Sequence, residues 1–94
     1  MVRSELIRKI AEERPDLSHQ AVEAAVNTIF KTIETTLVRG QRVEIRGFGV
    51  FLVSPRSARV GRNPRNGGAI SIPDKQIPRF KQSSMFHDRL NPLD

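Results

Sequence analysis

The hydrophobic period of this 94-residue chain changes from helical to alternating after Gly40, and this change limits the folds that the chain can adopt. Before Gly40, apolar residues recur at the three- and four-residue spacing of a helix. After Gly40, Val43 and Ile45 alternate with charged residues, which is the period of a strand with one buried face. Helices followed by strands predict an α+β fold.

Two helices are expected in the first 40 residues. Ser4 can cap the first helix, and Pro15 ends it. Ser18 can cap a longer second helix, and Gly40 can take the left-handed backbone angle that stops it. Because a short turn joins the two helices, this half of the chain is predicted to form a helical hairpin.

The second half reads as a small antiparallel sheet. Gly47 and Gly49 flank Phe48 and indicate a tight turn, since each glycine can adopt backbone angles that other residues avoid. A strand is expected to follow over residues 50–54, and a third strand is expected over residues 76–81. With the strand after Gly40, these segments predict a three-stranded sheet.

Between these strands the sequence predicts an extended β-ribbon arm. Segments 56–60 and 69–72 can pair around a tip at residues 61–68, which is rich in glycine, proline and asparagine. A two-stranded ribbon is at best marginally stable in water, so the arm is expected to be mobile until a ligand orders it. After the sheet, Ser83 or Ser84 can cap a short final helix.

The excess positive charge is confined to the middle of the chain. Residues 1–40 hold six basic and six acidic side chains, whereas residues 41–83 hold nine basic side chains against only Glu44 and Asp74. Arginine outnumbers lysine by twelve to four, and the planar guanidinium pairs well with phosphates and base edges. This distribution predicts a polyanionic partner that binds the middle segment.

The predicted tip holds a proline between arginines and asparagines. Pro64 presents a flat apolar ring, which could enter a minor groove and separate two base pairs while its neighbours hold the DNA. Alternatively, Pro64 only shapes a turn. The spacing favours nucleic acid, because a turn needs no series of arginines at every third position: Arg56, Arg59, Arg62 and Arg65.

A chain of this length buries only about two-thirds of its surface when it folds alone. It has no cysteine, so disulfides cannot supply stability, and dimerisation is the expected route. We therefore predict one domain over residues 1–94 in four parts: a helical dimerisation hairpin (1–40), a sheet (41–55 and 75–82), a DNA-binding arm (56–74) and a C-terminal helix (83–94).

Several of these residues form a recognisable pattern. The run Gly47-Phe48-Gly49-Val50-Phe51, followed by Arg56, Arg59 and Gly61-Arg62-Asn63-Pro64, resembles the signature of the bacterial HU and integration host factor family. The segment from Arg42 to Gly49 and the opening Ser4-Glu5-Leu6-Ile7 look most like the beta subunit of integration host factor. The resemblance spans the whole chain.

The resemblance implies an intertwined dimer with two arms that bends duplex DNA in recombination, replication and transcription. It implies a heterodimer with an alpha subunit, and an HU-like homodimer that coats DNA without sequence preference is the alternative. It places these residues near DNA: Arg3, Ser4, Arg42, Glu44, Arg46, Arg56, Arg59, Arg62, Asn63, Pro64 as the wedge, Arg65, Asn66, Lys75, Arg79, Lys81 and Ser84. It implies a dimer core that contains Phe30, Phe48, Phe51 and Phe80.

Two positions carry more specific expectations. Glu44 and Arg46 lie two apart on a predicted strand and should share a face, so the carboxylate would restrain the arginine against a minor groove and select sites by DNA shape. The alternative is a surface ion pair unrelated to DNA. Asn66 stands where the family usually has threonine, which puts the contact made there in doubt.

Other classes of function fit less well. His19 and His87 are the only histidines and lack ligand partners at metal-binding spacing, so we expect neither an enzyme nor a metal or other cofactor. The first ten residues lack the apolar core of a secretory signal, and the expected location is cytoplasmic and nucleoid-associated, without membrane contact. A helical module whose basic arm docks onto an acidic protein remains a rival of a different class.

Overall fold

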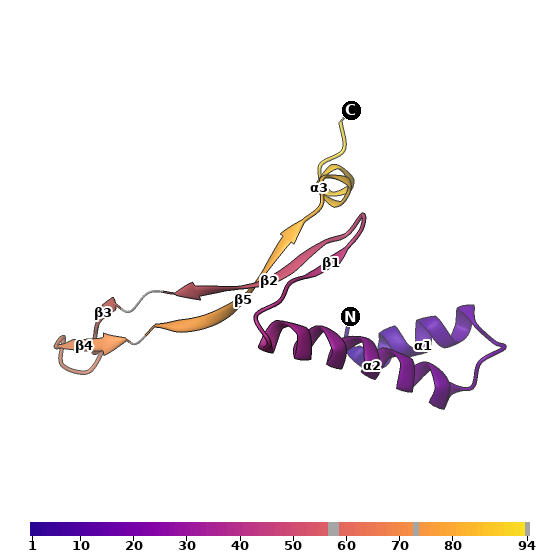
Figure 1. The fold of residues 1–94 in the computed structure, drawn as a ribbon, viewed down its shortest axis with the longest axis horizontal. Helices are drawn as coiled ribbons and strands as arrows, with labels where there is room; N and C mark the ends of the chain where they lie inside the picture. The colour runs from indigo at the N-terminus through magenta and orange to yellow at the C-terminus, as the bar shows by residue number, and fades with distance from the viewer. Residues whose placement is uncertain (57–58, 73, 94) are drawn as a thin grey trace. The chain divides into compact units, whose positions relative to one another are not determined.

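The computed structural model describes residues 1–56, 59–72 and 74–93, with the backbone alone at Arg59 and Ile72. The chain divides into two compact units, Met1–Thr35 and Thr36–Asp94, and the boundary lies inside the second helix. The elements follow one another in this order (Figure 1): α1 (Arg3–Glu13), α2 (His19–Val38), β1 (Val43–Ile45), β2 (Gly49–Arg56), β3 (Arg59–Arg62), β4 (Ala69–Ile72), β5 (Lys75–Gln82) and α3 (Ser84–Leu90).

The first unit is the predicted helical hairpin. Helix α1 starts two residues earlier than expected: Val2 is the N-cap, so the prediction that Ser4 caps this helix is wrong. The extended backbone of Val2 lets its carbonyl accept from the amides of Glu5 and Leu6, which needs no capping side chain. Ser18 caps α2 as predicted, because its Oγ accepts from the Ala21 amide at 3.1 Å.

The turn between α1 and α2 is closed by a two-point ion pair. Arg14 donates from Nε and Nη2 to the two carboxylate oxygens of Asp16, at 2.9 and 2.7 Å. This contact lowers the pKa of Asp16, since the guanidinium favours the ionised carboxylate. At the other end of α2, Gly40 has a positive φ of 77° and ends the helix, as the sequence predicted.

Little of the apolar surface is buried within one chain. Among the described residues, the buried apolar side chains are Ile7, Val22 and Val26. The apolar stripe of α2 continues past them to Ile29 and Phe30, which are 56% and 49% exposed. A stable protein rarely leaves such a stripe in water, so the stripe is typical of a surface that other apolar groups cover.

The second unit contains a three-stranded antiparallel sheet in the order β1-β2-β5, as predicted. The turn between β1 and β2 uses Gly47 at a φ of 80°, and the Phe48 amide donates to the Ile45 carbonyl at 2.9 Å. Gly49 does not take an unusual angle, contrary to the prediction. It is small for a different reason: a Cβ there would lie 2.5 Å from the Lys81 carbonyl oxygen.

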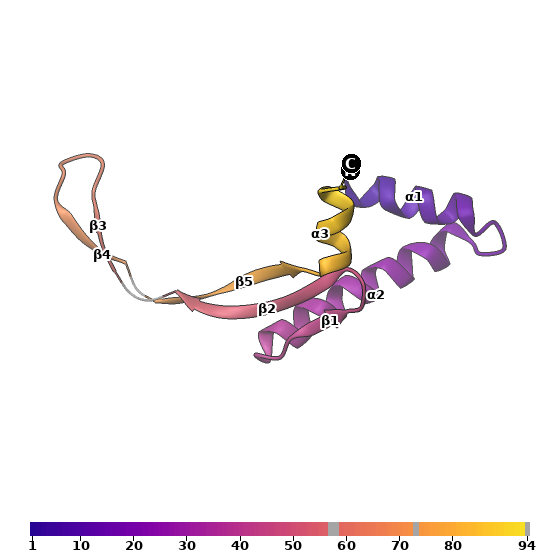
Figure 2. The same cartoon turned by 90° about the horizontal axis from the view of Figure 1, so that it is seen from above.

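The strands β3 and β4 form a second antiparallel pair that continues beyond the ends of β2 and β5 (Figure 2). The register pairs Val60 with Ser71 and Arg62 with Ala69, around a tip at residues 63–68. Arg56, which the sequence assigned to the arm, is the last residue of β2 and pairs with Lys75. Residues 57 and 58 of the predicted arm strand lie outside the described residues.

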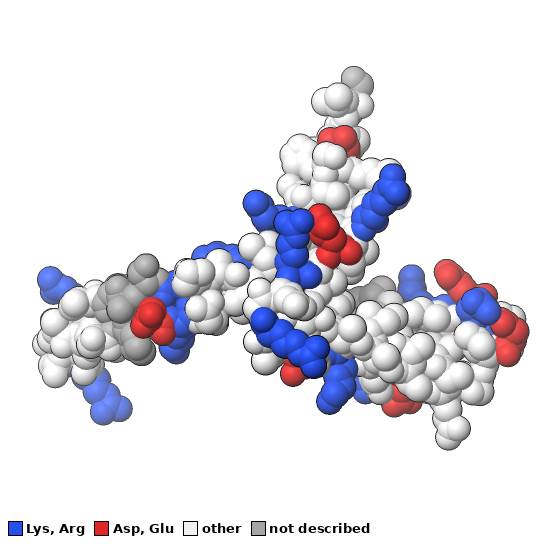
Figure 3. All heavy atoms as spheres, viewed as in Figure 1, with Lys and Arg blue, Asp and Glu red and all other residues white. Residues whose placement is uncertain are grey.

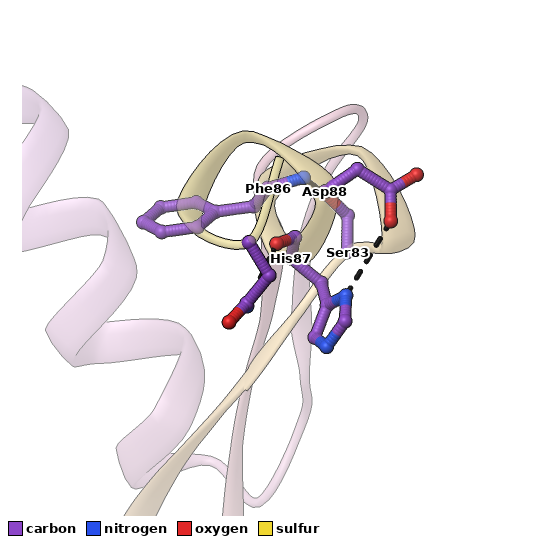
Figure 4. Close-up of polar contacts among 5 residues, drawn as sticks. Ser83, Phe86, His87 and Asp88 are labelled. Carbon is purple, nitrogen blue, oxygen red and sulfur yellow. Dashed lines mark hydrogen bonds and ion pairs between the residues drawn. The ribbon is translucent and has the colours of Figure 1, made fainter. Parts of the chain in front are cut away.

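The final helix α3 starts where the sequence allowed two choices. Ser83 is the N-cap, and its Oγ accepts from the amide of Phe86 at 3.1 Å; Figure 4 labels both residues. Ser84 is the first helical residue. The hairpin, the sheet, the ribbon and the short helix together confirm the predicted α+β fold. Within the described part of the chain, no helix is long and apolar enough to cross a membrane.

Candidate nucleic-acid interface

The pairing of β2 with β5 sorts their side chains onto two faces. Directly opposed residues share a face, and successive residues of a strand alternate between faces. The pairs Val50–Lys81, Leu52–Arg79, Ser54–Ile77 and Arg56–Lys75 therefore lie on one side, which we call the basic face. All four charged side chains of these two strands lie on this face.

The opposite side, the apolar face, has no charged residue on β2 or β5, both of which the structure describes throughout. Phe51 opposes Phe80 here, and their ring centroids are 5.0 Å apart. Phe48 from the turn lies 5.2 Å from Phe80 and 5.1 Å from Phe86 of α3. These four phenylalanines form one aromatic cluster.

Three of the four residues predicted for a dimer core thus lie together: Phe48, Phe51 and Phe80. The fourth, Phe30, lies on α2 in the first unit. Phe48 and Phe80 remain 40% and 43% exposed, so the aromatic cluster is not fully buried within a single chain. The sequence analysis did not assign Phe86 to this cluster, although Phe86 belongs to the apolar pattern of the last helix with Met85 and Leu90.

Figure 3 shows lysine and arginine side chains gathered over the sheet and at the far end of the arm, with a few acidic side chains among them. On the basic face, Arg79 is held by a contact across the strands: its Nε donates to Ser54 Oγ at 3.1 Å. Arg79 and Lys81 are exposed, so both are accessible to a polyanion.

The predicted pairing of Glu44 with Arg46 is wrong. Glu44 instead lies 3.6 Å from Arg42. The reason is that β1 ends at Ile45 and Arg46 already belongs to the turn, where the two-residue alternation of a strand no longer applies. Arg46 and Lys81, together with Glu44, line a hollow of about 610 Å³ that also touches Ser83.

Asparagine side chains organise the backbone at the arm tip. Asn63 Oδ1 accepts from the Arg65 amide at 2.9 Å, and Asn66 Oδ1 accepts from the Gly68 amide at 2.7 Å. In each case an asparagine side chain accepts from the backbone amide two residues later, which is the Asx turn that asparagine commonly forms. They leave Pro64 exposed at the outermost turn, and they give Asn66 a local structural role in place of the family threonine.

The remaining predicted DNA-binding residues are more dispersed. Arg3 donates from Nη1 to Asn27 Oδ1 and so ties α1 to α2; Ser4 lies beside it in the first unit. Ser84 begins α3, and Arg62 is exposed on β3. The side chain of Arg59 lies outside the described part, so its contact with DNA stays a prediction.

The two histidines lie next to single carboxylates. His87 Nδ1 is 3.4 Å from Asp88, as Figure 4 shows, and His19 Nδ1 is 3.9 Å from Glu23. Among the described residues there is no group of three or more histidine, cysteine, aspartate or glutamate side chains that could hold a metal ion.

A β2–β5 pair with a basic face and an opposite apolar face, continued by the two-stranded arm of β3 and β4, is typical of a β-ribbon protein whose basic surface suits a polyanion. The chain belongs to the family described as bacterial DNA-binding proteins, whose model matches residues 1–91. The family is one of DNA-binding proteins and not of enzymes.

Solved structures agree with this assignment. The chain is similar to Anabaena HU in a cocrystal structure with DNA, with 29% identity and a TM-score of 0.90 over 99% of this chain and 100% of that one. A mutant HU from Thermotoga maritima is 24% identical, with a TM-score of 0.69 over 97% of this chain and all of that one, and this likeness concerns the fold alone.

Proposed function

We propose that this protein binds duplex DNA with its basic face and arm, and bends the duplex by inserting Pro64 into the minor groove. The observation that carries the proposal is the separation of charge across one ribbon. Arg56, Lys75, Arg79 and Lys81 share one side while the aromatic cluster occupies the other. A cationic surface of this kind attracts phosphates regardless of sequence, and an apolar wedge at the tip adds deformation of the duplex.

The working form in this proposal is a dimer joined through apolar surface. The half-exposed aromatic cluster and the uncovered stripe of α2 at Ile29 and Phe30 supply that surface. The residues that resemble the beta subunit of integration host factor favour a heterodimer with an alpha subunit, and an HU-like homodimer is the alternative. Association with the nucleoid would follow from either form.

Two roles are compatible with this interface. As an integration host factor, the protein would bend particular sites for recombination, replication or transcription; as an HU-like protein, it would bend DNA with little sequence preference. The structure favours neither, because the Glu44–Arg46 pair on which site selection was predicted is replaced by Glu44 with Arg42. Competition binding across a panel of single-base variants distinguishes a selective from a non-selective protein.

A direct test uses a short duplex that carries a fluorescent donor and acceptor at its ends. Saturating protein is expected to raise energy transfer because bending brings the two ends together. A protein that docks its arm onto an acidic protein needs no wedge, so it would bind an acidic protein without bending DNA. Unchanged energy transfer at full occupancy would contradict the proposed bending function.

A further inference from the structure

Ser54 and Arg79 face each other diagonally across the β2–β5 ribbon. The register pairs Ser54 with Ile77 and Arg79 with Leu52, which puts all four residues on the basic face. Diagonal neighbours on a face are within reach of a long side chain. The guanidinium uses this reach, since Arg79 Nε donates to Ser54 Oγ at 3.1 Å.

The contact uses only the Nε–H group of the Arg79 guanidinium. Among the described residues, Ser54 is the one hydrogen-bond partner of Arg79, so both terminal nitrogens remain available. The Glu44 carboxylate on the same face is close to Arg42, and the residues opposite Ser54 and Arg79 are apolar. An arginine held in this way presents its two-nitrogen fork in a fixed direction, which suits the paired oxygens of a phosphate.

We propose that Ser54 is a positioning residue that orients the guanidinium of Arg79 toward a DNA phosphate. The inference rests on the proposed DNA-binding function and adds to it a residue that itself carries no charge. A free arginine must lose rotamer freedom when it binds a phosphate. Arg79 has lost part of that freedom before DNA arrives, because Ser54 fixes the guanidinium in the folded protein.

A double-mutant cycle tests the coupling. Ser54→Ala is expected to weaken duplex binding about threefold, the size of effect that one exposed hydrogen bond produces. Arg79→Ala is expected to weaken binding more and to lower the slope of log affinity against log salt by about 0.9, since one phosphate contact is lost. In the Arg79→Ala protein, adding Ser54→Ala should change nothing further.

Two variants provide matched controls. Ser54→Thr keeps the hydroxyl and should retain the affinity of the parent protein. Thr35→Ala removes an exposed hydroxyl from α2, outside the basic face and the arm, and should leave affinity unchanged. An equal loss from Ser54→Ala with and without Arg79 would overturn the proposal, because it would show that Ser54 acts through the strand and not through the arginine.

An NMR measurement detects the contact without DNA. The Nε–H of Arg79 should exchange slowly with water in the parent protein and faster in Ser54→Ala. Arg14 is an internal control, because its Nε donates to Asp16 in the other unit and should not respond. If Arg79→Ala leaves affinity and salt slope unchanged while the parent binds DNA tightly, the positioning role is wrong and the proposed function stands. If the parent protein fails to bind duplex DNA, both are wrong.

Discussion

Replacing Phe80 with aspartate is expected to abolish dimer formation and, with it, high-affinity DNA binding. The Phe80 ring lies 5.0 Å from Phe51, 5.2 Å from Phe48 and 6.2 Å from Phe86 between ring centroids, so it connects the aromatic cluster. Removing a packed phenylalanine costs about 3–5 kcal/mol, and a buried carboxylate adds a further penalty. Sedimentation equilibrium should therefore show monomer at micromolar concentrations where the parent protein is dimeric.

Phe80→Leu is the matched control for this prediction. It keeps an apolar side chain of similar reach on the apolar face and should preserve the dimer with reduced stability. The 43% exposure of Phe80 in the single chain is what makes the residue available to a partner. A dimer of parental stability in Phe80→Asp would show that the apolar face is not the interface between subunits.

Replacing Pro64 with alanine is expected to reduce DNA bending more strongly than it reduces affinity. Attraction comes from the lysines and arginines of the basic face and the tip, and these remain in the variant. The ring that would hold an unstacked base step open is lost, and unstacking costs a few kcal/mol per step. End-to-end energy transfer at saturation should fall toward that of the free duplex, while affinity falls by less than about tenfold.

Pro92→Ala is a suitable control, because Pro92 is an exposed proline in the tail after α3 and should not affect bending. The tip backbone can be checked in parallel. Its turn is held by Asn63 Oδ1 and the Arg65 amide, and the Pro64→Ala substitution leaves both groups in place. If Pro64→Ala bends the duplex as sharply as the parent protein, Pro64 is not the wedge.

Much of the fold could be predicted because its signals are local. The change of period at Gly40, the cap at Ser18 and the glycine turn at Gly47 depend on residues a few positions apart. Ser4 misled the prediction because an extended backbone at Val2 is sufficient to begin a helix, and many residues can adopt it. The first residue of such a helix is hard to predict because several neighbouring residues can each serve as its N-cap.

The parts of the site that sequence did not predict depend on register. The close approach of Gly49 to Lys81, the contact of Ser54 with Arg79 and the separation of charged from apolar residues all follow from which residues of β2 and β5 oppose each other. The charge count along the sequence located the basic segment, but it could not show that the basic side chains of β2 and β5 share one face of the sheet. The Glu44–Arg46 prediction failed because it extended a strand one residue into the turn.

The measurement that tests the account most directly is the salt dependence of binding to duplex DNA. Eight described lysine and arginine side chains lie on the basic face, its turn and the arm: Arg42, Arg46, Arg56, Arg62, Arg65, Lys75, Arg79 and Lys81. If each neutralises one phosphate, log affinity should fall against log salt with a slope of about −7 from each chain. A nearly flat dependence would contradict binding of DNA through this surface.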